Sequence, residues 1–544
     1  MLNGRPNIPV PVNEPIKGYT PGSPERKSLQ EELKRQLRKE VEIPIIIGGK
    51  RIRTGNLCDC RCPHDHQHVL GRFHNAGQKE VDLAVKAASE AWHDWARMPW
   101  EQRASIFLRA ADMLAGPWRD RVNAATMLGQ SKNVFQAEID SACELVDFWR
   151  FNPWYAQRIY EEQPPVSPRG MWNYTEQRAL EGFVFAVTPF NFTSIAGNLP
   201  TAPAMMGNTV IWKPASSAVY SAYQLMLLLE EAGLPPGVIN MVIGSGSTIG
   251  EPVMKNPALA GIHFTGSTAV FQRMWATVGA NIANYKTYPR IVGETGGKDF
   301  IFIHNSADAD YAAVAMLRGA FEFQGQKCSA ASRTYVPASM WDKVRKKLFD
   351  MLDTVKMGDV TDFSNFMNAV IDKAAFKEIS SYIDRTKKSK DAKVIYGGKH
   401  NDSKGYFIDP TVIEAKKPDY LTMCEEIFGP VLSVYVYDDR DFEKTLRICN
   451  ATSPYGLTGA VLAKDRKVIN QAYDALWQAA GNFYINDKPT GAVVGQQPFG
   501  GSRASGTNDK AGSMLNLLRW VSQRAVKETF VPPTDYRYPF LAED

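Results

Sequence analysis

The stretch GFVFAVTPFNF, residues 182–192, joins an apolar strand to a polar loop, and the chain repeats this unit. NTVIWKPA (208–215) and GIHFTGST (261–268) have the same form, and AYQLMLLLEEAGLPPGVINMVIG (222–244) supplies a helix and another strand between them. Strands rich in Val, Ile and Phe that alternate with helices predict an α/β fold with a parallel sheet. Because ligands bind beyond the carboxyl ends of such strands, we expect the chemistry at that edge.

The segments on either side of these units extend the same architecture. Residues 1–40 predict an extended arm and a solvated amphipathic helix, 43–73 predict short strands and turns, and 78–160 predict helices. A second set of α/β units occupies 298–486. The final stretch NLLRWVSQRAVKETFVPP (516–533) is typical of an edge strand that pairs elsewhere.

Composition predicts a globular protein that acts on a small molecule. Apolar residues make up 44% and charged residues 22% of 544, and 63 basic residues are mixed with 58 acidic ones. The mixed charges indicate no basic face, so we expect no nucleic-acid partner. No apolar run approaches about eighteen residues, so we expect no membrane partner. Seven cysteines, an odd and sparse set, indicate a reducing compartment. Without a secretory or transit pattern, we expect a bacterial cytoplasmic protein, with a processed protein of the mitochondrial matrix as the alternative.

The stretch CDCRCPHDHQH (58–68) holds three cysteines and three histidines. Zinc sites usually use cysteines separated by two to four residues, because the chain must curl around one ion. Here the cysteines and the histidines alternate, and alternate residues of a strand share one face without converging. We therefore predict two strand faces joined at Pro63 and no metal, with a metal site as the alternative.

Cys328 is the cysteine whose surroundings suggest reactivity. It lies in FEFQGQKCSAASRTYVP (321–337), a polar stretch just before a strand. Exposure and nearby positive charge there would favour a reactive thiolate. Taken alone, a single cysteine is more often a small buried apolar residue.

Three further stretches place polar side chains at strand ends. RIVGETGGKDF (290–300) puts Glu294 before a glycine pair that lets another group approach the backbone. Asn191 follows a strand and has an amide that could donate to an oxyanion. CEEIFGPVLSV (424–434) puts Glu426 and Phe428 before a Gly-Pro turn. Each of these also fits a turn, a cap or a solvated carboxylate when taken singly.

Together the motifs PFNF, WKPA, FTGS, ETGGK, QGQKC, EEIFGP and PFGGSRASG, in this order, resemble the NAD(P)-dependent aldehyde dehydrogenase superfamily from about Ile45 to Trp520. The resemblance implies a Rossmann-type cofactor domain, an α/β catalytic domain and a small β flap that joins subunits into a homodimer or higher homo-oligomer. The implied boundaries are 1–160 and 179–293 for the cofactor domain, 294–505 for the catalytic domain, and 161–178 with 506–544 for the flap and C-terminal tail.

The resemblance also implies catalytic roles that suit the residues. Cys328 would attack the aldehyde carbon, and Asn191 with the Cys328 backbone N–H would hold the oxygen. Hydride would pass to the cofactor, and Glu294 would activate the water that hydrolyses the thioester.

The implied cofactor is NAD. Lys213 and Glu426 would bind its ribose hydroxyls, Phe428 would lie beside the nicotinamide ribose, and residues near the pyrophosphate would complete the set. The full implied set is Lys213, Pro189, Thr265, Gly266, Ser267, Glu426 and Phe428. Many members that prefer NAD have Glu three residues after the lysine, where this chain has Ser216. Use of NADP therefore stays open.

The motifs ETGGKDF, GQKCSAASR and PFGGSRASGTNDKAG resemble the members that oxidise L-glutamate γ-semialdehyde to L-glutamate, the second step of proline catabolism. Such a substrate carries a carboxylate and an ammonium, so its pocket needs polar groups. Gly501 and Ser502 could form an anion nest, Ser329 could add a hydroxyl, and Phe192 could pack on the methylenes. Another acidic semialdehyde, such as the succinic one, is the alternative.

Overall fold

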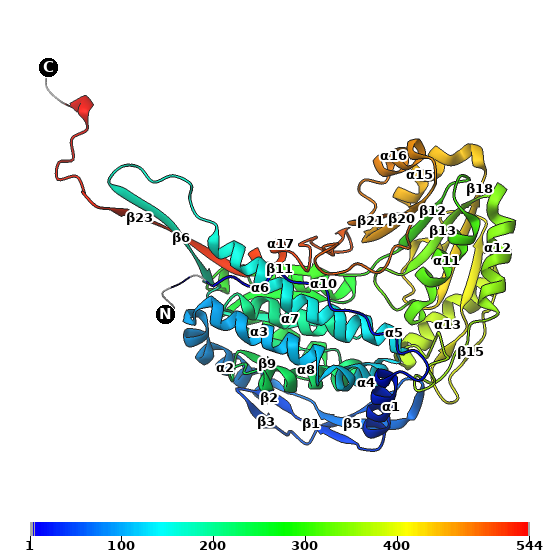
Figure 1. Cartoon of the computed structure of the whole chain (residues 1–544), viewed down its shortest axis with the longest axis horizontal. Helices are drawn as coiled ribbons and strands as arrows, with labels where there is room; N and C mark the ends of the chain where they lie inside the picture. The colour runs from blue at the N-terminus through cyan, green and yellow to red at the C-terminus, as the bar shows by residue number, and fades with distance from the viewer. Residues whose placement is uncertain (1–3, 5, 542–544) are drawn as a thin grey trace.

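Two seven-stranded sheets form the body of the molecule (Figure 1). The computed structural model describes residues 4 and 6–541. The first sheet has the order β11-β10-β7-β8-β9-β2-β3 and the second the order β14-β17-β18-β13-β12-β20-β21. The α/β fold with parallel strands is confirmed, since β7 to β11 pair in parallel and only β2 and β3 are antiparallel.

The first sheet shows the two-residue alternation expected of a sheet covered on both faces. Phe183 and Phe185 pack on one face, and Val184 and Ala186 pack on the other. Helices α2, α9 and α10 cover the first face, and α3, α4, α6, α7 and α8 cover the second. The strands are β2 (Ile45–Ile47), β3 (Lys50–Ile52), β7 (Phe183–Val187), β8 (Thr209–Lys213), β9 (Ile239–Met241), β10 (Leu259–Thr265) and β11 (Arg290–Glu294). The helices are α2 (Gln78–Arg97), α3 (Trp100–Ala115), α4 (Arg119–Gln130), α5 (Val134–Ala137), the π-helix η1 (Glu138–Glu144), α6 (Leu145–Glu161), α7 (Thr193–Met205), α8 (Val219–Glu231), α9 (Gly246–Lys255) and α10 (Thr268–Ala280).

The second sheet is built in the same way from the later part of the chain. All its pairs are parallel except β14 with β17. Its strands are β12 (Asp299–Ile303), β13 (Ala331–Pro337), β14 (Ala392–Tyr396), β17 (Thr411–Ala415), β18 (Val431–Tyr437), β20 (Thr458–Leu462) and β21 (Asn482–Ile485). Its helices are α11 (Ala309–Phe321), η4 (Glu322–Gly325), α12 (Ala338–Leu352), α13 (Lys373–Lys387), α14 (Leu421–Cys424), α15 (Phe442–Ala451) and α16 (Arg466–Ala475), and short pairs β15 (His400–Asn401) with β16 (Phe407–Ile408) and β19 (Tyr455–Gly456) with β22 (Ser502–Arg503) lie outside the sheet.

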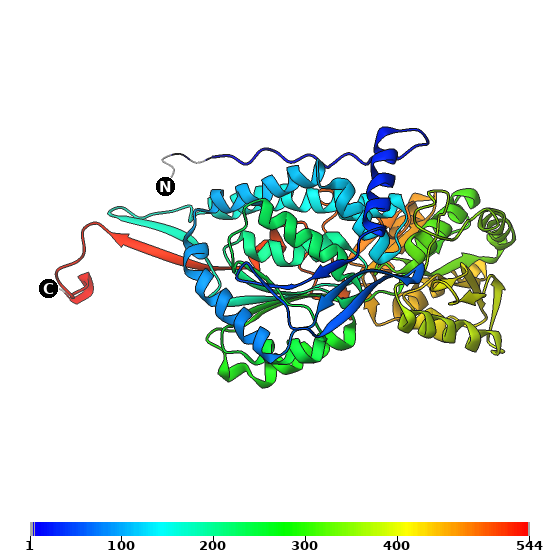
Figure 2. The ribbon, with the colours of Figure 1, turned by 90° about the horizontal axis from the view of Figure 1, so that it is seen from below.

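A two-stranded ribbon of β6 (Met171–Ala179) and β23 (Val521–Thr529) projects from the body (Figures 1 and 2). The predicted pairing of the C-terminal strand with the 161–178 stretch is therefore present. The residues before β23 do not belong to the ribbon, because Leu517 of α17 (Met514–Leu518) and Trp520 pack in the core of the first sheet.

The cysteine- and histidine-rich stretch forms the predicted strands. β4 (Leu57–Cys62) and β5 (Asp65–His74) are antiparallel around Pro63, and β1 (Val41–Ile43) pairs with β5. Cys60 and Cys62 are buried, whereas Cys58 is exposed. Within residues 4 and 6–541, no group of three or more His, Cys, Asp or Glu side chains is arranged to hold a metal ion.

The predicted N-terminal helix is α1 (Pro24–Leu37), which packs against α4. The arm before it runs along the outside of the helical layer (Figure 2). Among the helices that the structure describes, none is long and apolar enough to cross a membrane.

Candidate active site

Four strand ends of the first sheet form one row of polar groups. Val187 of β7 pairs with Lys213 at the end of β8 and with Phe264 near the end of β10. Thr265 in turn pairs with Glu294, the last residue of β11. The parallel register therefore brings the loops that begin after these residues to a single edge, as the sequence predicts.

The second sheet contributes the opposite ends of its strands. Cys328 lies just before β13, and Glu426 lies just before β18. The Gly297 N–H donates to Oε1 of Glu426 at 2.8 Å, and a Cβ on Gly297 would lie 2.3 Å from the carbonyl oxygen of Cys328. A Cβ on Gly296 would lie 2.1 Å from Oε2 of Glu426. The expected role of the glycine pair is confirmed, since another group packs directly on its backbone.

A cavity of about 930 Å³ lies between these two edges. Cys328 and Asn191 line it together with all seven residues predicted to bind the cofactor. Those seven are Pro189, Lys213, Thr265, Gly266, Ser267, Glu426 and Phe428. Ala215 also lines the cavity, whereas Ser216 is exposed and is not part of its wall.

The cavity offers groups that suit a dinucleotide. Burial lowers the pKa of Lys213 to about 8, and its Nζ donates only to the Pro214 carbonyl at 3.4 Å, so the ammonium is available for hydroxyl groups. Ser267 precedes the first turn of α10 and makes no side-chain capping bond, which leaves its hydroxyl and the helix N-terminus for an anion. The Phe428 ring meets Phe190 edge to face at 5.7 Å.

Left-handed backbone precedes the candidate nucleophile. Phe323, Gln324 and Gly325 have φ values of 51°, 55° and 66°. Nε2 of Gln324 holds this turn by donating to the carbonyls of Ser131 at 3.0 Å and Ala369 at 2.8 Å. Such strain costs about 1–3 kcal/mol for each non-glycine residue and is found at functional sites, where it fixes a nearby group.

Cys328 is buried, with 8% of its surface exposed. Burial raises the pKa of its thiol well above the usual value, and the charges of Glu294 and Asp299 raise it further. Lys327 does not offset this effect, because its ammonium pairs with Glu322 at 3.1 Å. The expectation of an exposed sulfur beside free positive charge is therefore wrong, and the thiol needs a group that accepts its proton.

Asn191 is buried and fixed near the nucleophile. Its Nδ2 donates to the carbonyl of Gln326 at 3.0 Å, two residues before Cys328. An amide nitrogen has two N–H groups, so the second remains to donate to an oxygen in the cavity that both residues line.

Glu294 does not line this cavity, but its carboxyl has the properties of a buried base. Burial raises the pKa of its carboxyl to about 8, the charge of Lys510 lowers it in part, and Oε1 has no hydrogen-bond partner. The segment from Ser505 to Thr507 holds the strand end in place. The Thr295 N–H donates to the Ser505 carbonyl at 2.9 Å, and the Gly293 N–H donates to Oγ1 of Thr507 at 3.0 Å.

The predicted substrate residues separate into two groups. Oγ of Ser329, directly after the nucleophile, shares a 2.8 Å hydrogen bond with Oγ1 of Thr490. Phe192 begins α7 and stacks with Nζ of Lys132, which lies 4.3 Å from the ring centroid. Ser329 thus directly follows the candidate nucleophile Cys328, and Phe192 directly follows Asn191, which carries the amide.

Gly501 and Ser502 lie elsewhere. Ser502 pairs with Gly456 in the β19–β22 ladder, and a Cβ on Gly501 would lie 2.7 Å from Cα of Leu457. Neither lines the cavity that holds Cys328. Ser329 and Phe192 do not line this cavity either. The glycine-rich segment packs in the β19–β22 ladder, and its role as an anion nest stays a prediction.

Sequence reasoning missed the charged groups next to Ser329. Lys327, Lys488 and Arg318 all act on the single carboxylate of Glu322, and Nζ of Lys488 donates to the Thr490 carbonyl at 2.9 Å. Asp487 also acts on Lys488, so three cations face two carboxylates, which leaves one net positive charge beside the Ser329 and Thr490 hydroxyls. No spacing in the sequence links Lys488 to Cys328, so this group could not be predicted.

Glu144 was also missed. Burial raises the pKa of its carboxyl to about 8, and Oγ of Ser194 donates to it at 3.0 Å. Its charge is the smallest of the five effects that raise the pKa of Cys328, and it does not line the cavity. The sequence holds a signal for it, because Asp140, Glu144 and Asp147 repeat at helical spacing within an otherwise apolar stretch.

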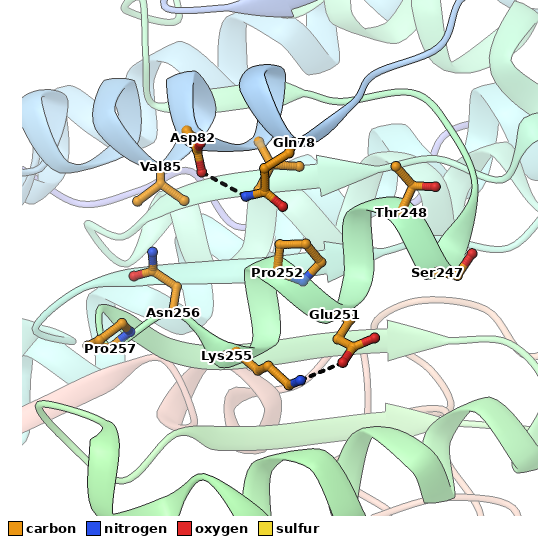
Figure 3. A pocket seen from close by; sticks show the side chains of 11 residues that line it. Gln78, Asp82, Val85, Ser247, Thr248, Glu251, Pro252, Lys255, Asn256 and Pro257 are labelled. Atoms are coloured by element: carbon orange, nitrogen blue, oxygen red, sulfur yellow. Dashed lines mark hydrogen bonds and ion pairs between the residues drawn. The ribbon is translucent and has the colours of Figure 1, made fainter.

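A second hollow of about 630 Å³ lies between α2 and α9 (Figure 3). Gln78 donates to Asp82 and Lys255 donates to Glu251, so its polar side chains already have partners. It holds none of the predicted catalytic residues.

Comparison with known proteins identifies the class that this fold and site define. The aldehyde dehydrogenase family matches residues 52–526, and the chain belongs to this family. It is 53% identical to the mitochondrial delta-1-pyrroline-5-carboxylate dehydrogenase of Dictyostelium discoideum over 99% of this chain and 97% of that protein. The crystal structure of the delta-pyrroline-5-carboxylate dehydrogenase from Mycobacterium tuberculosis bound with NAD is 52% identical, with a TM-score of 0.96 and full coverage of both chains. The Thermus 1-pyrroline-5-carboxylate dehydrogenase with bound NAD is 32% identical, with a TM-score of 0.90 over 97% of this chain and 100% of that one.

The charge of Lys510 gives a test of Glu294 as the base. A base acts when it is deprotonated, so turnover limited by hydrolysis should rise with pH through about 8, the pKa of Glu294. Lys510→Met removes a positive charge that stabilises the carboxylate, so the pKa of Glu294 rises. The rising limb of the pH profile then moves to higher pH. We expect this shift in the pH profile of kcat. Lys464→Met, at an exposed lysine paired with Asp308, is the control, and an unchanged limb in Lys510→Met would show that Glu294 does not set the profile.

Proposed function

We propose that the chain oxidises L-glutamate γ-semialdehyde, which forms from delta-1-pyrroline-5-carboxylate, to L-glutamate with NAD in the second step of proline catabolism. The observation that carries the proposal is the cavity that Cys328 and Asn191 share with the seven cofactor residues. The relatives of similar length are named for the same activity and support it.

The first half of the reaction uses the groups around Cys328. The sulfur attacks the aldehyde carbon, and its proton passes to the Glu294 carboxylate, whose pKa of about 8 suits a proton acceptor near neutral pH. The second N–H of the Asn191 amide donates to the oxygen of the thiohemiacetal. When bound, the nicotinamide supplies the acceptor for the hydride that leaves this intermediate.

The second half hydrolyses the thioester on Cys328. The proton that Glu294 accepted from Cys328 is first released to solvent. Glu294 then takes a proton from water as the water attacks the thioester carbon, and the C–S bond breaks to release the carboxylic acid product and the Cys328 thiolate, which takes the proton from Glu294. This carboxylate stays basic for two reasons. Burial disfavours its anionic form, and among the described residues Oε1 has no hydrogen-bond partner that would stabilise the anion. The same group therefore serves both covalent steps at one site.

The charged ends of the substrate match the two groups of buried charge. We assign the carboxylate to the Ser329 and Thr490 hydroxyls, which lie beside the positive charge of Lys327 and Lys488. We assign the ammonium to the carboxylate of Glu144. Phe192 would pack on the methylenes between the two charged ends. This arrangement favours the glutamate semialdehyde over the succinic one, which lacks an ammonium.

We infer that Lys213 and Glu426 bind the ribose hydroxyls, Phe428 packs on the nicotinamide ribose, and Pro189 with residues 265–267 complete the site. NAD is the proposed cofactor because relatives crystallise with it. The exposed Ser216 offers no carboxylate against a 2′-phosphate, so NADP remains a second substrate to assay.

We propose that the ribbon of β6 and β23 joins two copies of the chain. Trp172, Phe530 and Val531 are exposed on or just after it, with exposed fractions of 53%, 59% and 80%. Apolar side chains on a projecting ribbon suit a contact between subunits. We further infer a reducing compartment, the bacterial cytoplasm or the mitochondrial matrix, because all seven cysteines are free.

The substrate assignment is tested by following NADH or NADPH formation. We expect kcat/KM with glutamate γ-semialdehyde to exceed that with succinic semialdehyde, and NAD to be used better than NADP. Faster turnover of the succinic compound would replace the glutamate assignment with the other acidic semialdehyde. No reduced cofactor from either aldehyde, in protein shown to be folded, would refute the dehydrogenase assignment.

The carboxylate site is tested by Thr490→Val, which keeps the shape of a buried side chain and removes its hydroxyl. We expect a rise in KM for glutamate γ-semialdehyde of about three- to tenfold, the worth of one hydrogen bond to a charged group. Ser502→Ala is the matched control, because Ser502 lies in the β19–β22 ladder. A larger rise in KM with Ser502→Ala would restore the glycine-rich segment as the anchor.

A further inference from the structure

The N-terminal arm, defined here as residues 6–23, runs along the helical layer that contains α6, on the face of the first sheet opposite α9 and α10 (Figure 2). Its first described contacts are with α6, where Gln157 accepts from the Ile8 N–H at 2.6 Å and donates to Oδ1 of Asn7 at 3.0 Å. Further along, the Glu14 N–H donates to Oδ1 of Asp147 at 2.7 Å. The arm is therefore held by side chains of α6 over several turns.

The arm continues into a buried set of charges. The carboxylate of Glu14 accepts from Arg119 at 2.5 Å and from Arg150 at 2.8 Å. The Tyr19 hydroxyl donates to Glu138 at 2.8 Å, and Arg119 pairs with the same carboxylate. These contacts fix both sides of Asn13, so α4, η1 and α6 set the position of that residue.

Asn13 is the residue at which the arm contacts the later part of the chain, near Val494. Its Nδ2 donates to Oδ2 of Asp147 on α6 and to the carbonyl of Val494, each at 2.7 Å. Its Oδ1 accepts from Nε2 of Gln496 at 3.0 Å. One amide thus joins α6 to Val494, which lies 481 residues after Asn13.

The segment it joins, residues 487–499, is called here the return loop. Its apolar anchor is Val494, which packs against Phe148 and Phe151 of α6. Four residues earlier, Thr490 shares the hydrogen bond with Ser329, the neighbour of the nucleophile. Asn13 and Ser329 therefore hold the same loop at two points, one remote from the chemistry and one beside it.

We propose that Asn13 is a positioning residue for the substrate: by clamping the return loop to α6, it sets the distance between Thr490 and Ser329 at which the substrate carboxylate binds. The inference rests on the proposed function for the identity of the substrate. Asn13 touches neither substrate nor cofactor, and its effect passes through Val494 and Gln496 to Thr490. The cofactor cavity, which the return loop does not line, should be unaffected.

The test compares Asn13→Ala with Asn7→Ala, a matched change on the same arm that breaks a contact with α6 alone. We expect Asn13→Ala to raise KM for glutamate γ-semialdehyde about three- to tenfold, as for one or two lost hydrogen bonds. KM for NAD and kcat/KM for propanal, which lacks both charged ends, should stay as in wild type. Asn7→Ala should change none of these values.

Amide hydrogen exchange tests the clamp without relying on activity. We expect faster exchange across residues 491–497 in Asn13→Ala and wild-type exchange in Asn7→Ala. Gln496→Ala, which removes an exposed side chain from the loop side of the same contact, should raise KM in the same direction and serves if Asn13→Ala does not fold.

Equal KM values and equal loop exchange in Asn13→Ala and Asn7→Ala would overturn the inference. A fall in kcat/KM for propanal as large as that for glutamate γ-semialdehyde would also overturn it. If wild-type protein does not oxidise glutamate γ-semialdehyde, the proposed function fails on its own. In that case, amide hydrogen exchange across residues 491–497 alone decides whether Asn13 fixes the return loop.

Discussion

The site depends on the contact of Gly296 and Gly297 with the segments that carry Glu426 and Cys328. Here the carboxyl edge of the first sheet meets the amino edge of the second, and the Gly297 N–H donates to Glu426 at 2.8 Å. A side chain on Gly297 would collide with the Cys328 carbonyl. Because the two edges approach so closely, the loops after β7, β8 and β10 and the segment before β13 enclose one cavity.

The same closeness sets the chemistry. Burial raises the pKa of Cys328 well above its usual value and that of Glu294 to about 8, and the charge of Glu294 raises the pKa of Cys328 further. Lys327 pairs with Glu322, so it does not ease the ionisation of Cys328, whereas Lys510, which donates to the Gly481 and Gly500 carbonyls, lowers the pKa of Glu294 only in part. A thiol that is hard to ionise beside a carboxyl that readily takes a proton suits transfer of that proton between them.

The sequence predicted the parts of the site that lie at strand ends, because apolar runs followed by Asn191, Lys213 and Glu294 show where parallel strands stop. It could not predict contacts between segments far apart in the chain. Thr490 meets Ser329 and Asn13 meets Val494 only after both sheets and the return loop are in place. Ser502 shows a related limit: its glycine-rich stretch fits either an anion nest or a packed ladder in the sequence, and only the fold shows that it pairs with Gly456.

The central claim is that one buried carboxylate, Glu294, is the base for thioester hydrolysis on Cys328. The most direct measurement is pre-steady-state NADH formation by Glu294→Gln with glutamate γ-semialdehyde and NAD in excess. Loss of the base should stall hydrolysis by about 10²–10⁴-fold. The substitution also removes the acceptor of the Cys328 proton, but loss of the negative charge eases ionisation of that thiol, so the first half-reaction should fall much less. We therefore predict a burst of NADH followed by stalled turnover. Burst and steady-state rates that fall by the same factor, or turnover equal to wild type, would contradict the account.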